Sequence, residues 1–542
     1  MKIALVPLNP TVGDVPENAE KIFQFLEQAI NNHCELIIFP ELALVGYPLK
    51  DLIFYDLILE RQNQVLSKLQ RFSKKIAILV GGVAKNKGPG KPFYNAAYLF
   101  KNGQKFVYKK RLLPNYDVFD EERYFEPGEG PLTFKLGGQK FAVTICEDIW
   151  FYEEHLQKIH AKSLKTNLIP KNIDFLINLS ASPYEFGKEK KREDLLQKIT
   201  KDLKIGLIYI NQMGANDDLI FDGKVYVFKE TTRIDLESKG FTEGLLIYDT
   251  KWNETSLLRP ARDDNQKNSI WEDLHQALVM GIRDYVRKSD FSKVILGLSG
   301  GIDSALVAQL ACEALTPENV FSVVHPSRYT SPQSEQDAKK IAKTLKIKLD
   351  IIPIDPLHQL YEKTLQKVFP EEKIQDLTNQ NLQARLRGNL LMALSNQRGQ
   401  LLLNTTNKSE MAMGYGTLYG DMCGALAVLS DLTKEKIYAL ARHLNPKFEI
   451  IPKSVITKVP SAELKPHQKD SDTLPEYKIL DPLLETWIEK EEVYEKDLKK
   501  NKKTLLKKML SQEYKRKQAP VGLKVTAKAF GSGRRYPVVM KI

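Results

Sequence analysis

The sequence contains few cysteines and no long apolar run, and these two features exclude several classes of protein. Four cysteines lie far apart in 542 residues, with no CxxC pair and no histidine at metal-ligand spacing. We therefore expect neither a disulfide framework nor a structural zinc site, and we predict a reducing, cytoplasmic location. No stretch approaches the roughly 20 apolar residues that a membrane-spanning helix requires. The opening residues, MKIALVPLNP, indicate a core strand rather than a secretory signal.

A strong charge of one sign is also absent. Lysine and arginine number 80 and aspartate and glutamate 68, so the net charge of +12 comes from a mixed surface. This excess is compatible with nucleic acid, but phosphate-bearing small molecules explain it equally well. Hydrophobic residues make up 42% of the chain, which is enough for large cores and excludes a disordered protein.

Two successive patterns of alternating strands and helices run along the chain. Strands are expected at 3–8, 36–39, 76–80, 106–108, 141–145, 175–178 and 207–210, and then at 294–298, 320–324, 349–354 and 400–403. A polar, turn-rich segment at 257–269 predicts a linker, so we expect domains over 1–256 and 270–542. Near the end, 489–517 mixes lysine and glutamate in a way that is typical of a solvated helical face.

Three chemically suited residues follow expected strands in the first domain: Glu41, Lys110 and Cys146. Side chains at the ends of buried strands assemble active sites in α/β folds. Cys146 would attack an amide carbonyl as a thiolate. Glu41 would carry protons, and Lys110 would stabilise the negative charge that develops on the carbonyl oxygen. Taken singly, such a cysteine is more often a small core residue, such a glutamate a solvated acid, and such a lysine a charge at the edge of a sheet.

Four segments around these residues resemble the nitrilase, or carbon–nitrogen hydrolase, superfamily. They are FPELALVGYP (39–48), KKRLLPNYDVFDEERYFEPG (109–128), ICEDIW (145–150) and NLSASPYEFGK (178–188). The superfamily's Glu-Lys-Cys triad falls on Glu41, Lys110 and Cys146, and PNYDVFDE is most similar to its glutamine-amidase branch. The resemblance implies an αββα sandwich, a glutamine site near Tyr116, Ser182 and Lys188, and support of the triad by Glu147.

In the second domain the expected strand VILGL runs into SGGIDS (299–304) and then into a helical pattern. Glycines let the backbone approach a phosphate, and the following helix directs its free N–H groups at it. No GK[ST] follows the glycines, so this is not a Walker A loop. The loop resembles that of the ATP pyrophosphatases, which split ATP between the α- and β-phosphates. This implies a doubly wound parallel sheet and gives Asp303 the role of a hard oxygen ligand for Mg²⁺.

Segments downstream resemble the NAD synthetases. They are QNLQARLRGN (380–389), LLLNTTNKSEMAMGYGTLYGD (401–421), LTKEKIYAL (432–440), KVPSAELKP (458–466) and the tail at 514–537. The resemblance implies that ATP is contacted by Gly297, Leu298, Ser299, Gly300, Gly301, Ile302, Asp303, Ser304 and Thr405. It places Mg²⁺ on Asp303 and Glu410. It assigns the deamido-NAD region to Asn381, Arg385, Glu410, Asp421, Lys434 and Lys515. Glu410 could otherwise be a surface carboxylate, Asp421 a helix cap, and Arg385 with Arg387 a solvated basic pair.

The two halves fit one reaction, because amidation needs both an activated carboxylate and ammonia. We expect conversion of deamido-NAD, ATP, glutamine and water to NAD, AMP, pyrophosphate and glutamate, with a sheltered route for ammonia and a homo-oligomeric assembly. No nucleic acid or membrane partner is expected. Two alternatives stay open: a tRNA-modifying or thiolating ATP pyrophosphatase, and an amidotransferase for another carboxylate. A third, a non-catalytic module, conflicts with intact residues at every triad and metal position. Sulfur-transferring enzymes generally need a paired cysteine, which Cys312 and Cys423 do not form.

Overall fold

The structure is a computed structural model that describes residues 1–152, 168–230, 232–234, 236, 240–251, 266–371, 374–447 and 449–540. The chain divides into two compact units, Met1–Gln266 and Lys267–Ile542. Residues 257–265 of the expected linker lie outside the described residues, and the helix α5 spans Gln266–Lys288. No helix in the described ranges combines the length and the apolar character that crossing a membrane would need.

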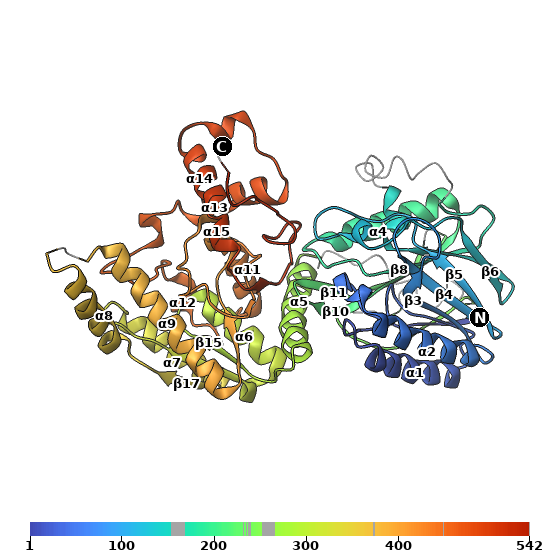
Figure 1. Ribbon diagram of the computed structural model, residues 1–542, viewed down its shortest axis with the longest axis horizontal. Helices are drawn as coiled ribbons and strands as arrows, with labels where there is room; N and C mark the ends of the chain where they lie inside the picture. Colours follow the sequence, from blue (N-terminus) through green and yellow to red (C-terminus); the bar gives the residue numbers. More distant parts are fainter. Residues whose placement is uncertain are drawn as a thin grey trace. The chain divides into compact units, whose positions relative to one another are not determined.

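Over the described residues, the first unit contains two six-stranded sheets, which Figure 1 shows with their covering helices. The first sheet has the order β14-β1-β2-β3-β4-β5 and the second β13-β12-β9-β8-β7-β6. The strands of the first are β1 (Lys2–Leu5), β2 (Leu36–Ile38), β3 (Ala77–Lys85), β4 (Phe93–Lys101), β5 (Gln104–Lys109) and β14 (Leu246–Asp249). Those of the second are β6 (Leu132–Leu136), β7 (Gln139–Ile145), β8 (Phe175–Ser180), β9 (Gly206–Asn211), β12 (Val225–Lys229) and β13 (Thr232–Ile234). A separate hairpin joins β10 (Met213–Asn216) to β11 (Leu219–Asp222).

Each sheet of this unit is covered on its outer face by helices. Side chains from both sheets, among them Ile3, Ile38, Phe141 and Ile177, fill the space between the sheets. The helices α1 (Val15–Asn31) and α2 (Asp56–Phe72) pack on the first sheet, and α4 (Lys188–Leu203) packs on the second. The predicted αββα sandwich is therefore confirmed.

Local sequence explains where these elements begin and end. In α1, Asp14 accepts a hydrogen bond from the N–H of Glu17, and apolar residues recur every three or four positions from Val15. The strand expected at 3–8 ends at Leu5, because Pro7 has no N–H to continue the ladder. Strands β2, β8 and β9 are buried on both faces, which accounts for their unbroken apolar runs.

The second unit is built on one parallel sheet of order β17-β16-β15-β18-β19-β20. Its strands are β15 (Val294–Gly297), β16 (Val320–Val324), β17 (Lys348–Ile351), β18 (Leu401–Asn404), β19 (Leu426–Ala427) and β20 (Val521–Gly522). Its main helices are α6 (Ile302–Leu315), α7 (Pro332–Leu345), α8 (Asp355–Val368), α9 (Asp376–Arg398), α10 (Lys408–Met413), α11 (Lys434–Leu444) and α12 (Lys453–Thr457). The predicted doubly wound α/β sheet is confirmed, and its central strand β15 leads directly into SGGIDS.

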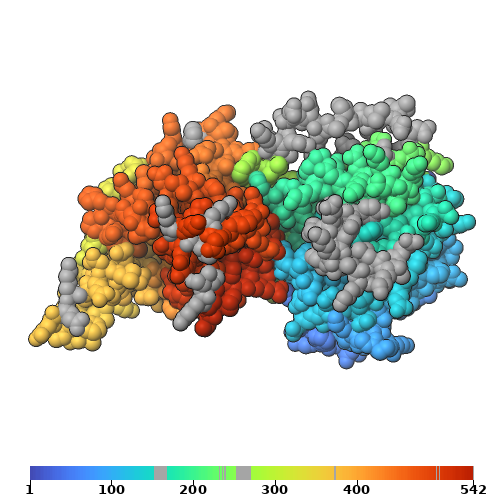
Figure 2. All heavy atoms as spheres, turned by 90° about the horizontal axis from the view of Figure 1, so that it is seen from above, coloured from blue at the N-terminus to red at the C-terminus, as the bar shows by residue number. Residues whose placement is uncertain are grey.

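The end of the chain corrects one prediction. Helices α13 (Tyr477–Leu484), α14 (Lys500–Ser511) and α15 (Glu513–Arg516) form a compact group, and Figure 2 shows the last part of the chain as continuous surface of the second unit. The prediction that 489–517 is a solvated helical face is wrong for one side of this stretch. There Leu506, Met509 and Leu510 are buried against Trp487. The abundance of lysine concealed an apolar stripe at helical spacing.

Candidate active sites

The first unit brings Glu41, Lys110 and Cys146 together in its interior. The Lys110 Nζ donates to Glu41 Oε1 at 2.7 Å and to Glu121 Oε1 at 2.8 Å. The side chains of Lys110 and Glu41 are fully buried, and Cys146 is 4% exposed. The three residues follow β5, β2 and β7, whose ends meet at one place although the chain separates them widely.

The carboxylate of Glu41 is fixed by donors on both oxygens. Besides Lys110, the Asn95 Nδ2 donates to Oε1 at 2.7 Å, and the backbone N–H of Ala181 donates to Oε2 at 2.8 Å. Hydrogen bonds on both oxygens leave the orientation of the carboxylate little freedom. Glu41 is thereby held in one orientation beside Lys110.

Cys146 sits at the turn that follows β7, with φ of +39°. A positive φ at a non-glycine residue is strained, and such strain persists where the surroundings enforce it. Asp148 provides that enforcement by accepting the N–H groups of Ile145, Arg111 and Leu112 at 2.9–3.0 Å. Burial raises the pKa of the Cys146 thiol, and the negative charge of Glu41 adds to the shift. The resting thiol is therefore protonated and needs a base to become nucleophilic.

Glu121 completes this cluster, and the sequence analysis did not assign it a role. Its Oε1 accepts from Lys110 and also from the Tyr47 hydroxyl at 3.0 Å. Burial and the charge of Glu41 raise its pKa to about 7, against the effect of Lys110. In the sequence it is one of three consecutive acids, and only the fold shows that it is buried while Glu122 is exposed.

The three residues expected to contact glutamine lie on separate elements of this unit. The Tyr116 hydroxyl donates to Glu147 at 3.0 Å, so Glu147 is tied to the expected binding site. Ser182 follows β8, directly after the Ala181 that donates to Glu41. Lys188 begins α4, and its Nζ lies 5.5 Å from the centre of the Trp150 ring.

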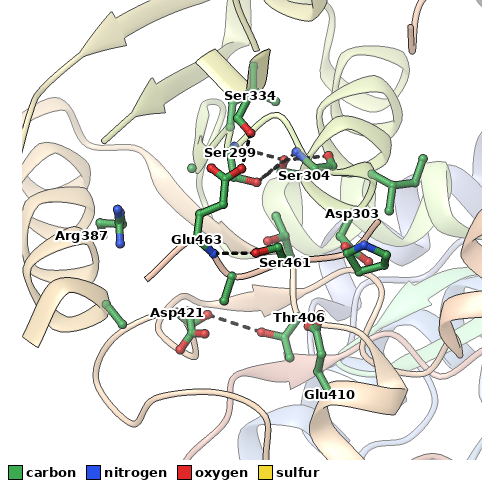
Figure 3. Close-up of a pocket in the computed structure, with 18 of the residues that line it drawn as sticks. Ser299, Asp303, Ser304, Ser334, Arg387, Thr406, Glu410, Asp421, Ser461 and Glu463 are labelled. Atoms are coloured by element: carbon green, nitrogen blue, oxygen red, sulfur yellow. Dashed lines mark hydrogen bonds between the residues drawn. The ribbon is translucent and has the colours of Figure 1, made fainter. Parts of the chain in front are cut away.

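The second unit holds a cavity of about 320 Å³ at the carboxyl ends of its central strands. It is lined by Gly297, Leu298, Ser299, Gly301, Ile302, Asp303 and Ser304 of the expected loop, and by Thr405, Glu410, Asp421 and Lys434. Figure 3 shows Ser299 and Ser304 on one side and Thr406 with Asp421 on the other. Ligands of open α/β sheets bind at this edge, so the cavity is the candidate nucleotide site.

The loop itself depends on a glycine at position 300. Gly300 has φ of +78°, and a Cβ placed there would lie 2.2 Å from the backbone oxygen of Ser334. Ser304 closes the turn, because its Oγ accepts the N–H of Ser299 at 3.2 Å and donates to the carbonyl of Gly301 at 3.1 Å. The following helix, α6, starts at Ile302, so its amino terminus faces the cavity.

A lysine lies between the two expected metal ligands. The Lys434 Nζ is 2.5 Å from Asp303 Oδ2 and 3.8 Å from Glu410 Oε1. Burial and the nearby charges of Asp303 and Asp470 raise the pKa of Glu410 to about 8, although Lys434 opposes this. Two carboxylates that repel each other at the mouth of a phosphate loop suit Mg²⁺, which is commonly held by one or two carboxylates together with substrate phosphates. No cluster of three or more acidic, histidine or cysteine ligands occurs among the described residues.

The remaining expected residues converge on one loop, Gly414–Asp421, which contributes Tyr415, Gly420 and Asp421 to the cavity wall. Asn381 accepts from the Thr417 hydroxyl at 2.8 Å, and the N–H of Thr417 donates to Asp421 at 2.6 Å. The exposed Arg385 donates to the carbonyl of Leu418 at 3.2 Å. Lys515 donates to the carbonyls of Gly414 and Gly416 at 2.8 Å each. Of this group, Asp421 lines the cavity.

Several cavity residues were missed by sequence reasoning. Arg387 lines the cavity, and its Nε donates to the carbonyl of His325 at 3.1 Å. Burial lowers its pKa to about 10. Arg387 lies two positions after Arg385 in α9, so helical geometry turns the two side chains to different faces. This spacing is the signal in the sequence that separates Arg387 from Arg385. Glu463 also lines the cavity, where it accepts from the hydroxyls of Ser331 and Ser334 and from Lys458.

Comparisons with known proteins agree with this arrangement. The carbon-nitrogen hydrolase family model matches residues 2–259, and the NAD synthase model matches residues 274–519. A glutamine-dependent NAD(+) synthetase of Synechocystis sp. is 45% identical over 99% of this chain and 98% of its own, and one of Thermotoga maritima is 40% identical with the same coverage. The solved structure of the Acinetobacter baumannii glutamine-dependent NAD+ synthetase in complex with ADP is 36% identical. Its TM-score is 0.75, and the match covers 99% of this chain and 98% of that one.

Proposed function

The chain belongs to the family of glutamine-dependent NAD(+) synthetases, and from that premise we propose which of its residues perform each half of the reaction. The first unit releases ammonia from glutamine, and the second uses it to amidate deamido-NAD at the expense of ATP. The observation that carries the proposal is the buried cluster in which Lys110 bridges Glu41 and Glu121 beside Cys146. Such a cluster provides a nucleophile, an oriented base and a fixed cation at one place.

In the first unit, Glu41 takes the thiol proton of Cys146 as the sulfur attacks the amide carbon of glutamine. Lys110 stabilises the oxyanion of the tetrahedral state. Ammonia leaves with the proton from Glu41, and a thioester remains on Cys146. Water, which loses a proton to Glu41, then hydrolyses the thioester, and Glu41 returns that proton to the sulfur. Tyr116, Ser182 and Lys188 bind the glutamine, Glu147 supports them, and Glu121 holds Lys110 in place.

In the second unit, Gly297–Ser304 and Thr405 bind ATP at the amino terminus of α6. A carboxylate oxygen of deamido-NAD attacks the α-phosphorus, the bond to the bridging oxygen breaks, and pyrophosphate leaves. Ammonia then attacks the acyl carbon and displaces AMP, which gives the amide of NAD and releases one proton. The Gly414–Asp421 loop forms the side of the site that binds deamido-NAD, and it is held in place by Asn381, Arg385, Asp421 and Lys515. Lys434 balances the negative charge of Asp303 and Glu410.

Asp303 and Glu410 would hold Mg²⁺, which neutralises charge on the departing pyrophosphate. Their oxygen-only donor set and the raised pKa of Glu410 fit a site that accepts a cation. Loss of one carboxylate, as in Asp303→Asn, should weaken the Mg²⁺ dependence of nucleotide binding as well as turnover.

The two reactions imply further organisation. We propose that residues 1–256 and 270–542 contain the functional domains, and that the linker expected at 257–269 ends before Gln266, where α5 begins. Ammonia is mostly ammonium at neutral pH and is then not nucleophilic, so a sheltered passage between the two sites, within a homo-oligomer, would favour its capture. Isotopic dilution with external ammonium tests the passage, and sedimentation tests the assembly. The four free cysteines fit the reducing cytoplasm.

One experiment tests the function as a whole. Purified chain is incubated with Mg-ATP, glutamine and a panel of carboxylate acceptors that includes deamido-NAD, and the amidated product is identified by mass spectrometry. NAD, AMP and pyrophosphate in equal amounts are expected. Amidation of a different member of the panel would refute the assigned acceptor, and an electrophoretic shift with tRNA would favour an RNA-modifying enzyme.

A further inference from the structure

A buried arginine outside the catalytic cluster anchors the outer helix of the first unit. Arg192 lies in α4 and is 1% exposed. Its Nη1 donates to Asp222 Oδ2 at 2.7 Å, and its guanidinium lies 5.4 Å from the centre of the Tyr209 ring. A buried ion pair gives little stability compared with apolar packing, so its presence suggests a role in fixing geometry.

From Asp222 the hydrogen bonds continue toward the catalytic cluster. The second oxygen of Asp222 accepts from Asn211 Nδ2 at 2.7 Å. Asn211 then holds the backbone of Ser182 at two points, because its Oδ1 accepts the N–H at 2.8 Å and its Nδ2 donates to the carbonyl at 2.9 Å. Asn211, Asp222 and Ser182 are all at most 3% exposed. Water therefore cannot substitute for any of these bonds without a rearrangement.

The chain of bonds ends at both parts of the amidase site. Ser182 is an expected glutamine contact, and the preceding residue, Ala181, donates its N–H to the Glu41 carboxylate at 2.8 Å. Lys188, another expected glutamine contact, precedes Arg192 by four positions and so lies on the same side of α4. Anchoring Arg192 thus fixes the first turn of the helix from which Lys188 extends.

We propose that Arg192, Asp222 and Asn211 are positioning residues for glutamine hydrolysis, which hold the Ala181–Ser182 backbone against Glu41 and the bound amide. The inference rests on the proposed function of the first unit. In the proposed mechanism none of the three residues transfers a proton or bonds to the reacting sulfur. They act by keeping one backbone N–H on the base and one serine in the glutamine site before substrate arrives.

Steady-state glutaminase kinetics of the full chain test this assignment, with ammonium-driven NAD formation measured in parallel. Asn211→Leu removes both bonds to Ser182, and we expect the KM for glutamine to rise at least tenfold and kcat/KM to fall about 100-fold. Arg192→Lys should lower kcat/KM about tenfold. Asp222→Asn, which keeps an oxygen for Asn211, should lower it about threefold. Ammonium-driven synthesis should stay within twofold of the unaltered chain in all three variants.

A second arginine of the same unit provides the matched control. Like Arg192, Arg233 forms an ion pair and lies against a tyrosine ring: it pairs with Glu193 of α4 at 2.9 Å and lies 4.8 Å from the Tyr226 ring centre. Its partner is Glu193 and not Asp222, so it does not belong to the series of bonds that reaches Ser182. Arg233→Lys should leave the KM for glutamine within twofold.

KM does not depend on the fraction of folded enzyme, so a purely structural role would leave it unchanged. An unchanged KM in Asn211→Leu, an unchanged kcat/KM in Arg192→Lys, or a parallel loss of ammonium-driven synthesis would overturn the assignment. An unaltered chain without glutaminase activity would instead refute the proposed function, and this inference with it.

Discussion

The two sites of this chain both place one lysine beside two carboxylates, but they differ in how deeply these groups are buried. In the first unit, Lys110 lies between Glu41 and Glu121 with side-chain exposures of 0%, 0% and 5%. In the second, Lys434 lies beside Asp303 and Glu410, whose side chains are 17% and 19% exposed at the edge of an open cavity. In the proposed mechanism the attacking group of the amide site belongs to the protein, so this site is already filled by its own side chains. The second site borders a cavity of about 320 Å³, which in the same proposal takes the phosphates and the cation.

The largest expected effect separates the two sites entirely. Cys146→Ala removes the nucleophile, so glutamine-driven NAD formation should fall by about 10⁴-fold or more. Ammonium-driven formation should remain within twofold, because the second unit needs ammonia and not its source. Both rates are measured by NAD-specific fluorescence with saturating Mg-ATP. Loss of both activities would show that the sites are not separable and would count against the division proposed above.

Exchanging the central lysine of each site for methionine tests the contrast in burial. Lys110→Met leaves two buried carboxylates without a cation, and we expect a loss of about 3–5 kcal/mol in the stability of the first unit. Lys434→Met should cost less than Lys110→Met, because its partners Asp303 and Glu410 are partly exposed. Differential scanning calorimetry measures both. Equal losses of stability in the two variants would mean that the partial exposure of Asp303 and Glu410 does not reduce the cost of removing their lysine.

The same two variants differ in activity. Lys110→Met should abolish glutamine-driven synthesis alone, whereas Lys434→Met should reduce synthesis with either nitrogen donor.

The phosphate loop offers a sharper comparison within one site. Gly300→Ala introduces a Cβ 2.2 Å from the backbone oxygen of Ser334 at a φ of +78°, so we expect ATP binding to weaken about 100-fold. Gly301→Ala is the matched control, because its φ is −93° and the nearest heavy atom is the Ser299 hydroxyl at 3.3 Å. It should weaken binding no more than about threefold. Isothermal titration with ATP distinguishes the two, and similar losses would show that the loop tolerates no side chain at either glycine.

The smallest expected effect is a dependence of stability on pH in both units. The pKa of Glu121 is raised to about 7, mainly by burial, and that of Glu410 to about 8. The unfolded chain releases these protons near the ordinary pKa, at lower pH than the folded chain does. Stability therefore falls as pH rises from the ordinary value toward the raised one, and then levels off.

Glutamine substitutions identify the carboxyl groups responsible. Glu121→Gln should flatten this fall in the first unit and Glu410→Gln in the second, when calorimetric transitions are followed from pH 4.5 to 8. An unchanged slope in either variant would assign the dependence to other groups.

The sequence predicted the architecture well where hydrophobic pattern and proline placement decide it. Uninterrupted apolar runs gave the buried strands, and the resemblance to known families brought Glu41, Lys110 and Cys146 to one cluster although 105 positions separate the first from the last. Side chains whose environment depends on distant contacts were harder to predict. Glu121 looks like its acidic neighbours, and only the packing of Tyr47 and Lys110 around it shows that it differs.

Helical periodicity distinguishes residues that composition alone groups together. Arg385 and Arg387 look like one basic pair, yet a helix turns residues two apart to different sides, and Arg387 is the one that lines the cavity. Likewise, the lysines of 489–517 concealed the apolar stripe of Leu506, Met509 and Leu510. In both places the helical spacing of the residues, and not the composition of the segment, determines which side chains are buried.

The contact between Gly300 and the carbonyl of Ser334 has a consequence for protein engineering. The phosphate loop rests directly on the first turn of α7, so its curvature is shaped by a segment that lies some thirty positions further along the chain. A chimaera that carried SGGIDS in another parallel sheet would lose the contact with Ser334, and the turn would be less rigid. Grafting the loop together with Ser331–Ser334 would preserve the pair as a single transferable part.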